Sequence, residues 1–230
     1  MGHVRVIPTL LLDGKALVKT SKFSHPVYIG DPINAVRIFN EKEVDELILC
    51  DITATIQKRS PDFDLIESIV SESFMPICYG GGIKKIEDAE ILFRLGVDKI
   101  AINSAAVEDM YLIQELASRY GNQSIVVSID YKRNMWGTQK VFINSGKKNT
   151  GLDPVEFARK IELAGAGEIY LTSLDREGSM QGYDLEMLKL MSDATGIPII
   201  ATGGAGEVMH FRAAIDAGAS AVTAGGMFVF

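Results

Sequence analysis

Three aspartates follow short apolar runs, which is where a parallel α/β fold places catalytic side chains. Asp51 ends the run ELILC, Asp130 ends SIVVSI, and Asp175 comes shortly after EIYLTS. The run before Asp130 is so apolar that its carboxyl should be partly desolvated, which raises its pKa toward the range useful for proton transfer. We therefore expect Asp130 to act as an acid/base group, with a loop-capping role as the alternative. Asp51 is a weaker candidate, because DIT also suits an Asx turn.

Glycines and small polar residues gather after other apolar runs and form two candidate anion-binding corners. Small residues let backbone N–H groups approach an anion closely, although the same glycines could simply make tight turns. One corner follows the runs MPICYG and DKIAIN, and the other follows EIYLTS, GIPIIA and SAVTA. Lys19, expected in the loop after the first run, is either a further anion contact or a solvated lysine. The candidate phosphate-binding residues are Lys19, Gly82, Asn103, Ser104, Thr172, Gly178, Gly203, Gly204, Gly225 and Gly226.

Four charged residues stand at the opposite ends of alternate runs: Arg5, Glu46, Lys99 and Glu168. Two positive and two negative side chains in these places could form a closed ring across the bottom of a barrel, since buried charges persist only when they are paired. The simplest interpretation of such a ring is a stabilising plug. A gate is the alternative.

The chain alternates between eight β-branched runs and amphipathic stretches, and this alternation predicts the fold. Asp31-Pro32 and Asp153-Pro154 are typical helix starts, and Gly96 and Gly218 are typical glycines after a helix end. Eight strand–helix repeats in 230 residues favour one closed (β/α)8 barrel domain over residues 1–230. The polar stretch 132–151 predicts a small hairpin, and the sequence ends directly after the eighth run, so we expect the eighth helix to be missing.

An internal repeat divides the predicted barrel into two halves. Glu46 and Glu168, Gly81 and Gly203, and Gly96 and Gly218 are each 122 positions apart. Equal offsets predict two pseudosymmetric half-barrels. A site on their common axis would suit an elongated substrate with an anionic group at each end.

Composition limits the class of protein. A net charge of −7 argues against a nucleic-acid partner, and no apolar run is long enough to cross a membrane. Two cysteines do not make a disulfide framework, so a reducing cytoplasm is the expected compartment. The histidines lack metal-ligand spacing and there is no P-loop or dinucleotide fingerprint, so we expect neither metal nor cofactor.

The motifs taken together resemble one family, the cyclase subunit (HisF) of imidazole glycerol phosphate synthase. The resemblance runs nearly from end to end and includes the strings GGGIKKIEDAE and TSLDREGSMQGYD. It implies a barrel that binds a bisphosphorylated, nucleotide-like substrate at its carboxyl-terminal face. It also implies a glutaminase (HisH-like) subunit docked on the amino-terminal face, with ammonia passing through the middle of the barrel.

The resemblance implies a role for several residues. Asp130 matches one of the family's two catalytic aspartates, and Asp98 matches a position that contacts the glutaminase. The gate at the channel entrance would be formed by Arg5, Glu46, Lys99 and Glu168.

One catalytic position departs from the family pattern. The family's first strand reads like I-P-C-L-D-V, whereas this chain has IPTLLL, so Leu11 stands where the second aspartate belongs. A leucine cannot transfer a proton. Thr9, Cys78 and Ala101 are further departures around the expected cavity.

An intact entrance with an altered reaction end points to a paralogue that receives ammonia and presents it to another acceptor. Similar barrels are associated with the amidation of sugars in surface-polysaccharide or glycan biosynthesis, in which an acetamido group becomes an acetamidino group. Two alternatives stay open: a genuine cyclase of histidine biosynthesis, and a non-catalytic subunit that activates a glutaminase.

Overall fold

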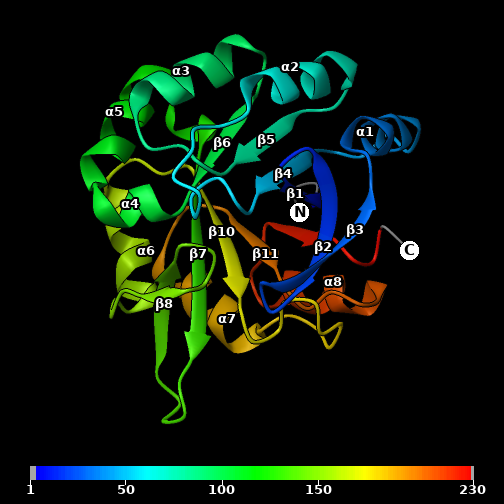
Figure 1. Cartoon of the computed structure of the whole chain (residues 1–230). Helices are drawn as coiled ribbons and strands as arrows, with labels where there is room; N and C mark the ends of the chain where they lie inside the picture. The colour runs from blue at the N-terminus through cyan, green and yellow to red at the C-terminus, as the bar shows by residue number, and fades with distance from the viewer. Residues whose placement is uncertain (1–3, 229–230) are drawn as a thin grey trace.

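The computed structural model describes residues 4–228, and within them eight parallel strands close a barrel (Figure 1). β1 pairs with β4 on one side and with β12 on the other, which completes the circle. The predicted closed barrel is confirmed, because each of the eight apolar runs forms one of its strands. These strands are β1 (Arg5–Asp13), β4 (Leu47–Asp51), β5 (Ile77–Gly80), β6 (Lys99–Ile102), β7 (Ile125–Arg133), β10 (Glu168–Ser173), β11 (Ile199–Thr202) and β12 (Ala221–Ala224).

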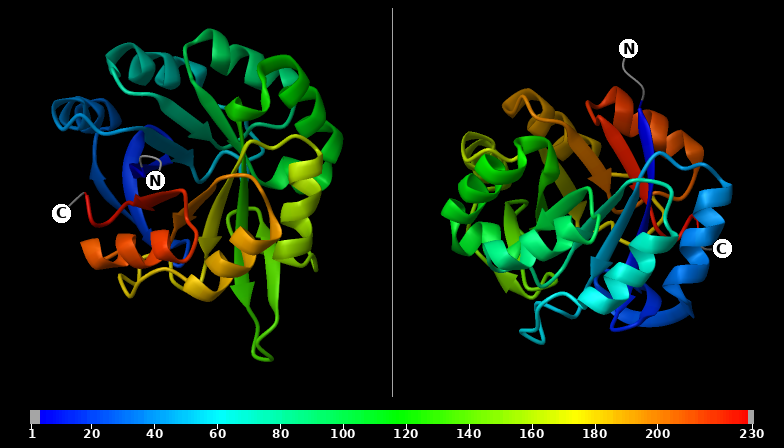
Figure 2. Two further views of the ribbon diagram at one scale, coloured as in Figure 1. Left: turned by 180° about the vertical axis from the view of Figure 1, so that it is seen from behind. Right: turned by 90° about the horizontal axis from the view of Figure 1, so that it is seen from above.

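Helices follow the strands and cover the outside of the barrel (Figure 2). Asp31 and Asp153 are N-caps whose side chains accept backbone N–H bonds, and a proline begins each helix, as predicted. No helix follows β12 in the part of the chain that the structure describes. The helices are α1 (Pro32–Glu41), α2 (Phe63–Glu72), α3 (Ile86–Arg94), α4 (Ser104–Glu108), α5 (Met110–Tyr120), α6 (Pro154–Leu163), α7 (Leu185–Ala194) and α8 (Val208–Asp216), with a 3-10 turn at Asn122–Ser124.

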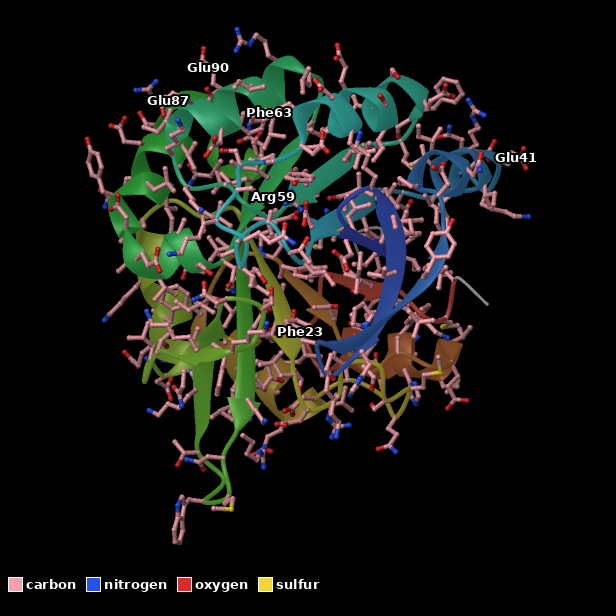
Figure 3. The ribbon with its side chains drawn as sticks, viewed as in Figure 1. Phe23, Glu41, Arg59, Phe63, Glu87 and Glu90 are labelled. Atoms are coloured by element: carbon pink, nitrogen blue, oxygen red, sulfur yellow. The ribbon has the colours of Figure 1, made fainter. Side chains whose placement is uncertain are left out.

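Amphipathic patterning decides which side of each helix faces the sheet. On α3, Ala89 and Leu92 are buried, whereas Glu87 and Glu90 are exposed and point away from the barrel (Figure 3). Gly96 follows the helix with a φ of +98°, which is the backbone geometry that ends a helix at glycine. No described helix has the length and apolar character needed to cross a bilayer.

Five elements of one half of the barrel correspond to five elements of the other half at a constant offset. The same offset of 122 that separates the paired glycines carries the bounds of α1, α2, α3, β5 and β6 onto those of α6, α7, α8, β11 and β12. The predicted two-fold pseudosymmetry is therefore confirmed over these elements.

Two hairpins extend the barrel strands at their carboxyl ends. β7 pairs with β8 (Gln139–Ile143), which pairs with β9 (Lys148–Asn149), so the hairpin predicted after the fifth strand is confirmed. The segment after β1 forms a second hairpin, β2 (Ala16–Ser21) and β3 (Ser24–Gly30), where the sequence predicted a loop. Buried Leu17 and Val18 hold β2 against the barrel, and this tertiary contact gives a strand to a segment of mixed polarity.

The interior of the barrel is packed and is not an open pore. Side chains alternate along each strand, so every second residue faces inward. One inward residue from each of the eight strands contributes to a single buried cluster. The cluster is made of Ile7, Ile48, Cys78, Ala101, Val126, Tyr170, Ile200 and Ala221.

Candidate active site

The four charged residues at the amino ends of the barrel strands form a closed ring. Arg5 contacts Glu46 Oε2 at 2.6 Å through Nη1 and Glu168 Oε1 at 2.7 Å through Nη2. Lys99 Nζ lies 3.0 Å from Glu46 Oε2 and 3.2 Å from Glu168 Oε2. Each cation therefore bridges both carboxylates, as the sequence pattern predicted. The geometry itself is compatible with either a plug or a gate.

Burial strengthens the ion pairs of the ring, because its two carboxylates are shielded from solvent. Glu46 is 3% exposed and Glu168 is 9% exposed. Burial alone would lower the pKa of Arg5, but the charges and hydrogen bonds of Glu168 and Glu46 outweigh it and raise that pKa. Because charges this deep are stable only in pairs, the ring persists as a unit.

Asp130 lies at the other end of the barrel interior, on β7, and is 6% exposed. Ser128 Oγ donates to its Oδ1 at 3.1 Å, and the side-chain amide of Asn103 donates to its Oδ2 at 3.3 Å. Burial raises the pKa of Asp130 to about 6, against the opposing effect of neighbouring hydroxyls. A carboxyl with this pKa can both accept and donate a proton near neutral pH, which fits the acid/base role expected from the sequence.

Leu11 belongs to the inward series of β1, which also contains Arg5, Ile7 and Thr9. It pairs in register with Cys50 on β4. Burial, followed by the charges of Asp130 and Asp51, raises the pKa of the Cys50 thiol to about 12, so this thiol is neutral. Asp51 on β4 faces away from Leu11, and the carboxyl on the same face of β1 is that of Asp13, two residues or about 7 Å further along the strand.

Asp51 lies one residue beyond Cys50 on β4, so its side chain faces the opposite side of the strand. Its Oδ1 accepts bonds from the backbone N–H groups of Thr53 and Ala54, and Arg59 reaches its Oδ2 at 2.6 Å. Arg59 is labelled in Figure 3 on the loop between β4 and α2. This geometry favours the Asx-turn alternative over the catalytic one, because all of these bonds hold the loop.

Asp175 also has a structural contact. Its Oδ2 accepts the backbone N–H of Arg133 at 2.9 Å and so ties the loop after β10 to the end of β7. Asp130 thus remains the acid/base candidate among the three aspartates named from the sequence.

Replacing Asp51 with alanine should destabilise the fold. The side chain is 2% exposed, and its loss leaves Arg59 and the turn amides without their acceptor. We expect a loss of about 3–5 kcal/mol in the free energy of unfolding, measured by urea denaturation. Arg37→Ala is the matched control, because Arg37 pairs with Glu72 on the exposed surface and its removal should leave stability unchanged. Equal effects of the two substitutions would contradict the turn-holding role.

The glycine pairs after β5 and β11 meet neighbouring backbone closely. Gly81 has a φ of +123°, and a Cβ there would lie 2.5 Å from the carbonyl oxygen of Asp51. Gly204 has a φ of +111°, and a Cβ there would overlap the Gly182 carbonyl. Gly82 and Gly203 also have positive φ. Tight packing of the turns therefore accounts for glycine at these positions, and anion binding is an additional role that stays a prediction.

Asn103 and Ser104 bring the first corner next to Asp130. Asn103 directly follows β6, and its amide bridges the Ser128 carbonyl at 3.1 Å and Asp130. Ser104 Oγ lies 3.3 Å from Asn144 Oδ1 on the hairpin after β7. The structure thus groups these two predicted residues with the acid/base candidate.

The remaining predicted residues lie on several elements at the carboxyl end. Gly225 and Gly226 follow β12 next to the Thr9 carbonyl and Met180, and Gly178 packs against Ser21 on β2. Thr172 is buried on β10 in register with Asp130. Lys19 lies in β2 opposite Val27, which corrects its predicted place in a loop.

Asp98 lies at the opposite end of the barrel, where a partner contact was expected. It is exposed and directly precedes β6. Its Oδ2 accepts the Ile77 N–H at 2.8 Å, so this side chain also orders the start of β5.

Sequence reasoning missed two inward-facing residues. Ser128 bonds Asp130 directly, and the hydroxyl of Tyr170 lies 3.3 Å from Thr9 Oγ1 inside the barrel. The signal that could have found them is the alternation along β7 and β10, since both share the inward face with residues already named.

A groove of about 580 Å³ opens beside the second corner. It is lined by charges of both signs, including Arg133, Arg176, Asp184 and His210. Gly182 lines this groove and donates its N–H to the Gly204 carbonyl, which connects the groove to the corner. The residues that line this groove are not the inward-facing residues of the barrel strands that include Asp130, so we assign the groove no chemistry.

A closed parallel barrel with a buried carboxyl and glycine corners at the carboxyl ends of its strands defines the class of (β/α)8-barrel enzymes. Comparison with known proteins gives the family: the chain belongs to the histidine biosynthesis protein family, which it matches over residues 5–230.

The relatives are similar over nearly their whole length. A Pseudomonas aeruginosa protein named "Putative imidazole glycerol phosphate synthase subunit hisF2" is 49% identical, with 100% of this chain and 92% of the relative aligned. The imidazole glycerol phosphate synthase subunit HisF of Streptomyces coelicolor is 40% identical, over 99% of this chain and 90% of its own length. That of Pyrobaculum aerophilum is 42% identical, over 99% and 90%. The resemblance found from the motifs is confirmed.

Proposed function

We propose that this protein is the synthase-type subunit of a two-component glutamine amidotransferase. A glutaminase subunit supplies ammonia at the amino ends of the barrel strands, and the barrel delivers it to an anionic acceptor at the carboxyl ends. The observation that carries the proposal is the position of the two charged sites, with the closed ring at one end of the interior and Asp130 at the other. The relatives named as imidazole glycerol phosphate synthase subunits support it.

Asp130 is the group that moves protons in this proposal. In its ionised form it accepts a proton from the ammonium or amine nitrogen, and in its acid form it returns one to the acceptor. Ser128 and Asn103 hold the carboxyl in place through their hydrogen bonds. The glycine corners offer backbone N–H groups to the anionic ends of the acceptor.

Leu11 determines which acceptor fits. The ring-closing reaction of the family uses two catalytic carboxylates, and this chain has only one of them, Asp130. We therefore propose a paralogue whose acceptor is a sugar. Its acetamido group becomes an acetamidino group in glycan or lipopolysaccharide biosynthesis. A separate amidotransferase activates the acetamido oxygen as a leaving group, with a nucleoside triphosphate as the co-reactant, and forms the new C–N bond from the ammonia that the barrel delivers. The histidine-pathway cyclase remains the second candidate, because the family match and the relatives' names favour it.

Leu11→Asp distinguishes these two candidates. Purified wild-type protein, given the histidine-pathway substrate and ammonium chloride, should form imidazole glycerol phosphate at a rate near background. Leu11→Asp should raise that rate by about 100-fold or more, since a positioned acid/base group contributes factors of this size. Leu11→Asn is the matched control, because the asparagine side chain has the same shape as aspartate but does not titrate. Rapid cyclisation by the wild type would overturn the sugar-acceptor proposal.

A further inference from the structure

Tyr170 lies across the interior of the barrel, between the charged ring and Asp130. It is 7% exposed, and its hydroxyl lies 3.3 Å from Thr9 Oγ1 on β1 and 3.3 Å from Thr202 Oγ1 on β11. β10 and β1 are not neighbours, because β11 and β12 stand between them in the barrel. The phenol ring therefore spans the interior from one wall toward another.

Tyr170 is the largest member of the buried layer that closes the interior. Two residues before it on the same strand face is Glu168 of the ring, and two residues after it is Thr172. The charged ring and the mouth of the barrel, which is the end where Asp130 and Thr172 lie, are thus on opposite sides of the phenol. Burial raises the pKa of Tyr170, so the group stays neutral and keeps a hydrogen to donate.

Buried polar atoms that lack a close hydrogen bond occur on both sides of this layer. Glu46 Oε1 belongs to the ring, while at the carboxyl ends of the strands Thr172 Oγ1 neighbours Asp130 and Thr223 Oγ1 neighbours Tyr170, neither in close hydrogen-bond geometry. All three side chains are buried, with exposures of 3%, 3% and 1%. A buried polar atom without a hydrogen-bond partner is unfavourable, so such atoms favour the presence of a small polar molecule. Ammonia and water are both small enough and have the donors needed.

We propose that Tyr170 is a second barrier, separate from the charged ring, and that Thr9 and Thr202 hold it closed. A small polar molecule passes only when the phenol swings aside, and it rests at Glu46 Oε1 before this step and at the hydroxyls of Thr172 and Thr223 after it. The ammonia part of this inference rests on the proposed function. The barrier part does not, because it concerns access to the layer alone.

The two cysteines of the chain provide the measurement. Cys78 belongs to the same layer as Tyr170 and is 1% exposed, whereas Cys50 lies nearer the mouth and is partly exposed. The probe is methylmercury chloride, and the rate of modification of each cysteine is followed by peptide mass spectrometry. In the wild type, Cys50 should react and Cys78 should be protected.

Variants that loosen the phenol should expose Cys78 selectively. Thr202→Val removes one hydrogen bond and should speed Cys78 modification about 5-fold, and Tyr170→Phe removes both and should speed it about 25-fold. The rate at Cys50 should change by less than about 2-fold, a selectivity that general loosening of the fold would not produce. Tyr183→Phe is the matched control, because its buried hydroxyl bonds the Thr223 carbonyl outside this layer.

The outcomes separate this inference from the proposed function. If Cys78 stays protected in Tyr170→Phe and Thr202→Val, or if Tyr183→Phe exposes it equally, the barrier is overturned. If Cys78 access changes as expected but no nitrogen passes from a glutaminase partner, the proposed function fails and the barrier stands. Circular dichroism of each variant excludes unfolding as the cause of access.

Discussion

Asp130→Asn should lower ammonia-dependent turnover while making the folded protein more stable at pH 8. The acid/base role predicts a loss of about 100- to 10,000-fold in rate. With the histidine-pathway substrate, this loss is measured in protein that carries Leu11→Asp. Turnover in that protein depends on both the introduced carboxyl and that of Asp130. Asp193→Asn is the matched control, because Asp193 is an exposed aspartate on α7 that pairs with Lys189 at the surface.

The gain in stability follows from the direction of the pKa shift. Burial raises the pKa of Asp130 from 3.8 to about 6, so the folded state binds the proton more tightly than the unfolded state does. The contribution of Asp130 to stability is therefore most favourable below pH 4 and is lost as the pH rises through about 6, by about 3 kcal/mol in total. Asparagine does not titrate and avoids this loss. The stability difference between variant and wild type should be about 3 kcal/mol at pH 8 and should disappear below pH 4.

Urea denaturation of both proteins at pH 4, 6 and 8 measures this difference. A constant difference across the three pH values would contradict the desolvated carboxyl. Turnover that requires ionised Asp130 should also fall as the pH drops through about 6.

Lys99→Met should uncouple the use of glutamine from the use of free ammonium. Lys99 contacts both Glu46 and Glu168, so its loss leaves two buried carboxylates with Arg5 as their remaining ring cation. In the Leu11→Asp background with the histidine-pathway substrate, we expect glutamine-dependent formation of imidazole glycerol phosphate to fall about 10-fold or more, because the entrance no longer holds its closed geometry. Product formation from added ammonium chloride should stay within about 3-fold of the wild type.

The same substitution should cost about 3–5 kcal/mol of folding stability, as removal of one partner from a buried ion pair does. Lys189→Met is the matched control, because Lys189 pairs with Asp193 in a solvent-exposed position on α7. A ring that merely stabilises the fold would lose stability in Lys99→Met and keep the ratio of glutamine-dependent to ammonium-dependent rates. That result would leave the plug as the correct interpretation.

The sequence predicts the barrel well because its strands are buried on both faces. Such strands are continuous apolar runs in the sequence. The offset of 122 also relates the equivalent elements of the two half-barrels without any structural information. The hairpin β2–β3 escapes this signal, because Val27 and Tyr28 are exposed on β3 and no apolar run marks it. A two-stranded extension of this kind depends on packing against β1.

The site is less predictable, because it depends on which way each side chain faces. Asp51 and Asp130 look alike as ends of apolar runs, and only the register of β4 turns Asp51 away from the interior. The alternation along β10 places Tyr170 on the inward face, but its partners cannot be read from the sequence. Its contact with Thr9 joins residues 161 positions apart, which closure of the barrel alone brings together.

In the proposed function, nitrogen moves inside the protein from a glutaminase docked at the ring to the acceptor near Asp130. A complex of a glutaminase with the Leu11→Asp variant is given the histidine-pathway substrate, glutamine labelled with ¹⁵N in its amide and an excess of unlabelled ammonium. Mass spectrometry then measures the isotope in the imidazole glycerol phosphate that forms. The product should keep the ¹⁵N label despite the excess of unlabelled ammonium, because the nitrogen does not mix with the solvent. A product whose isotope content equals that of the surrounding ammonium from the first turnover would contradict it.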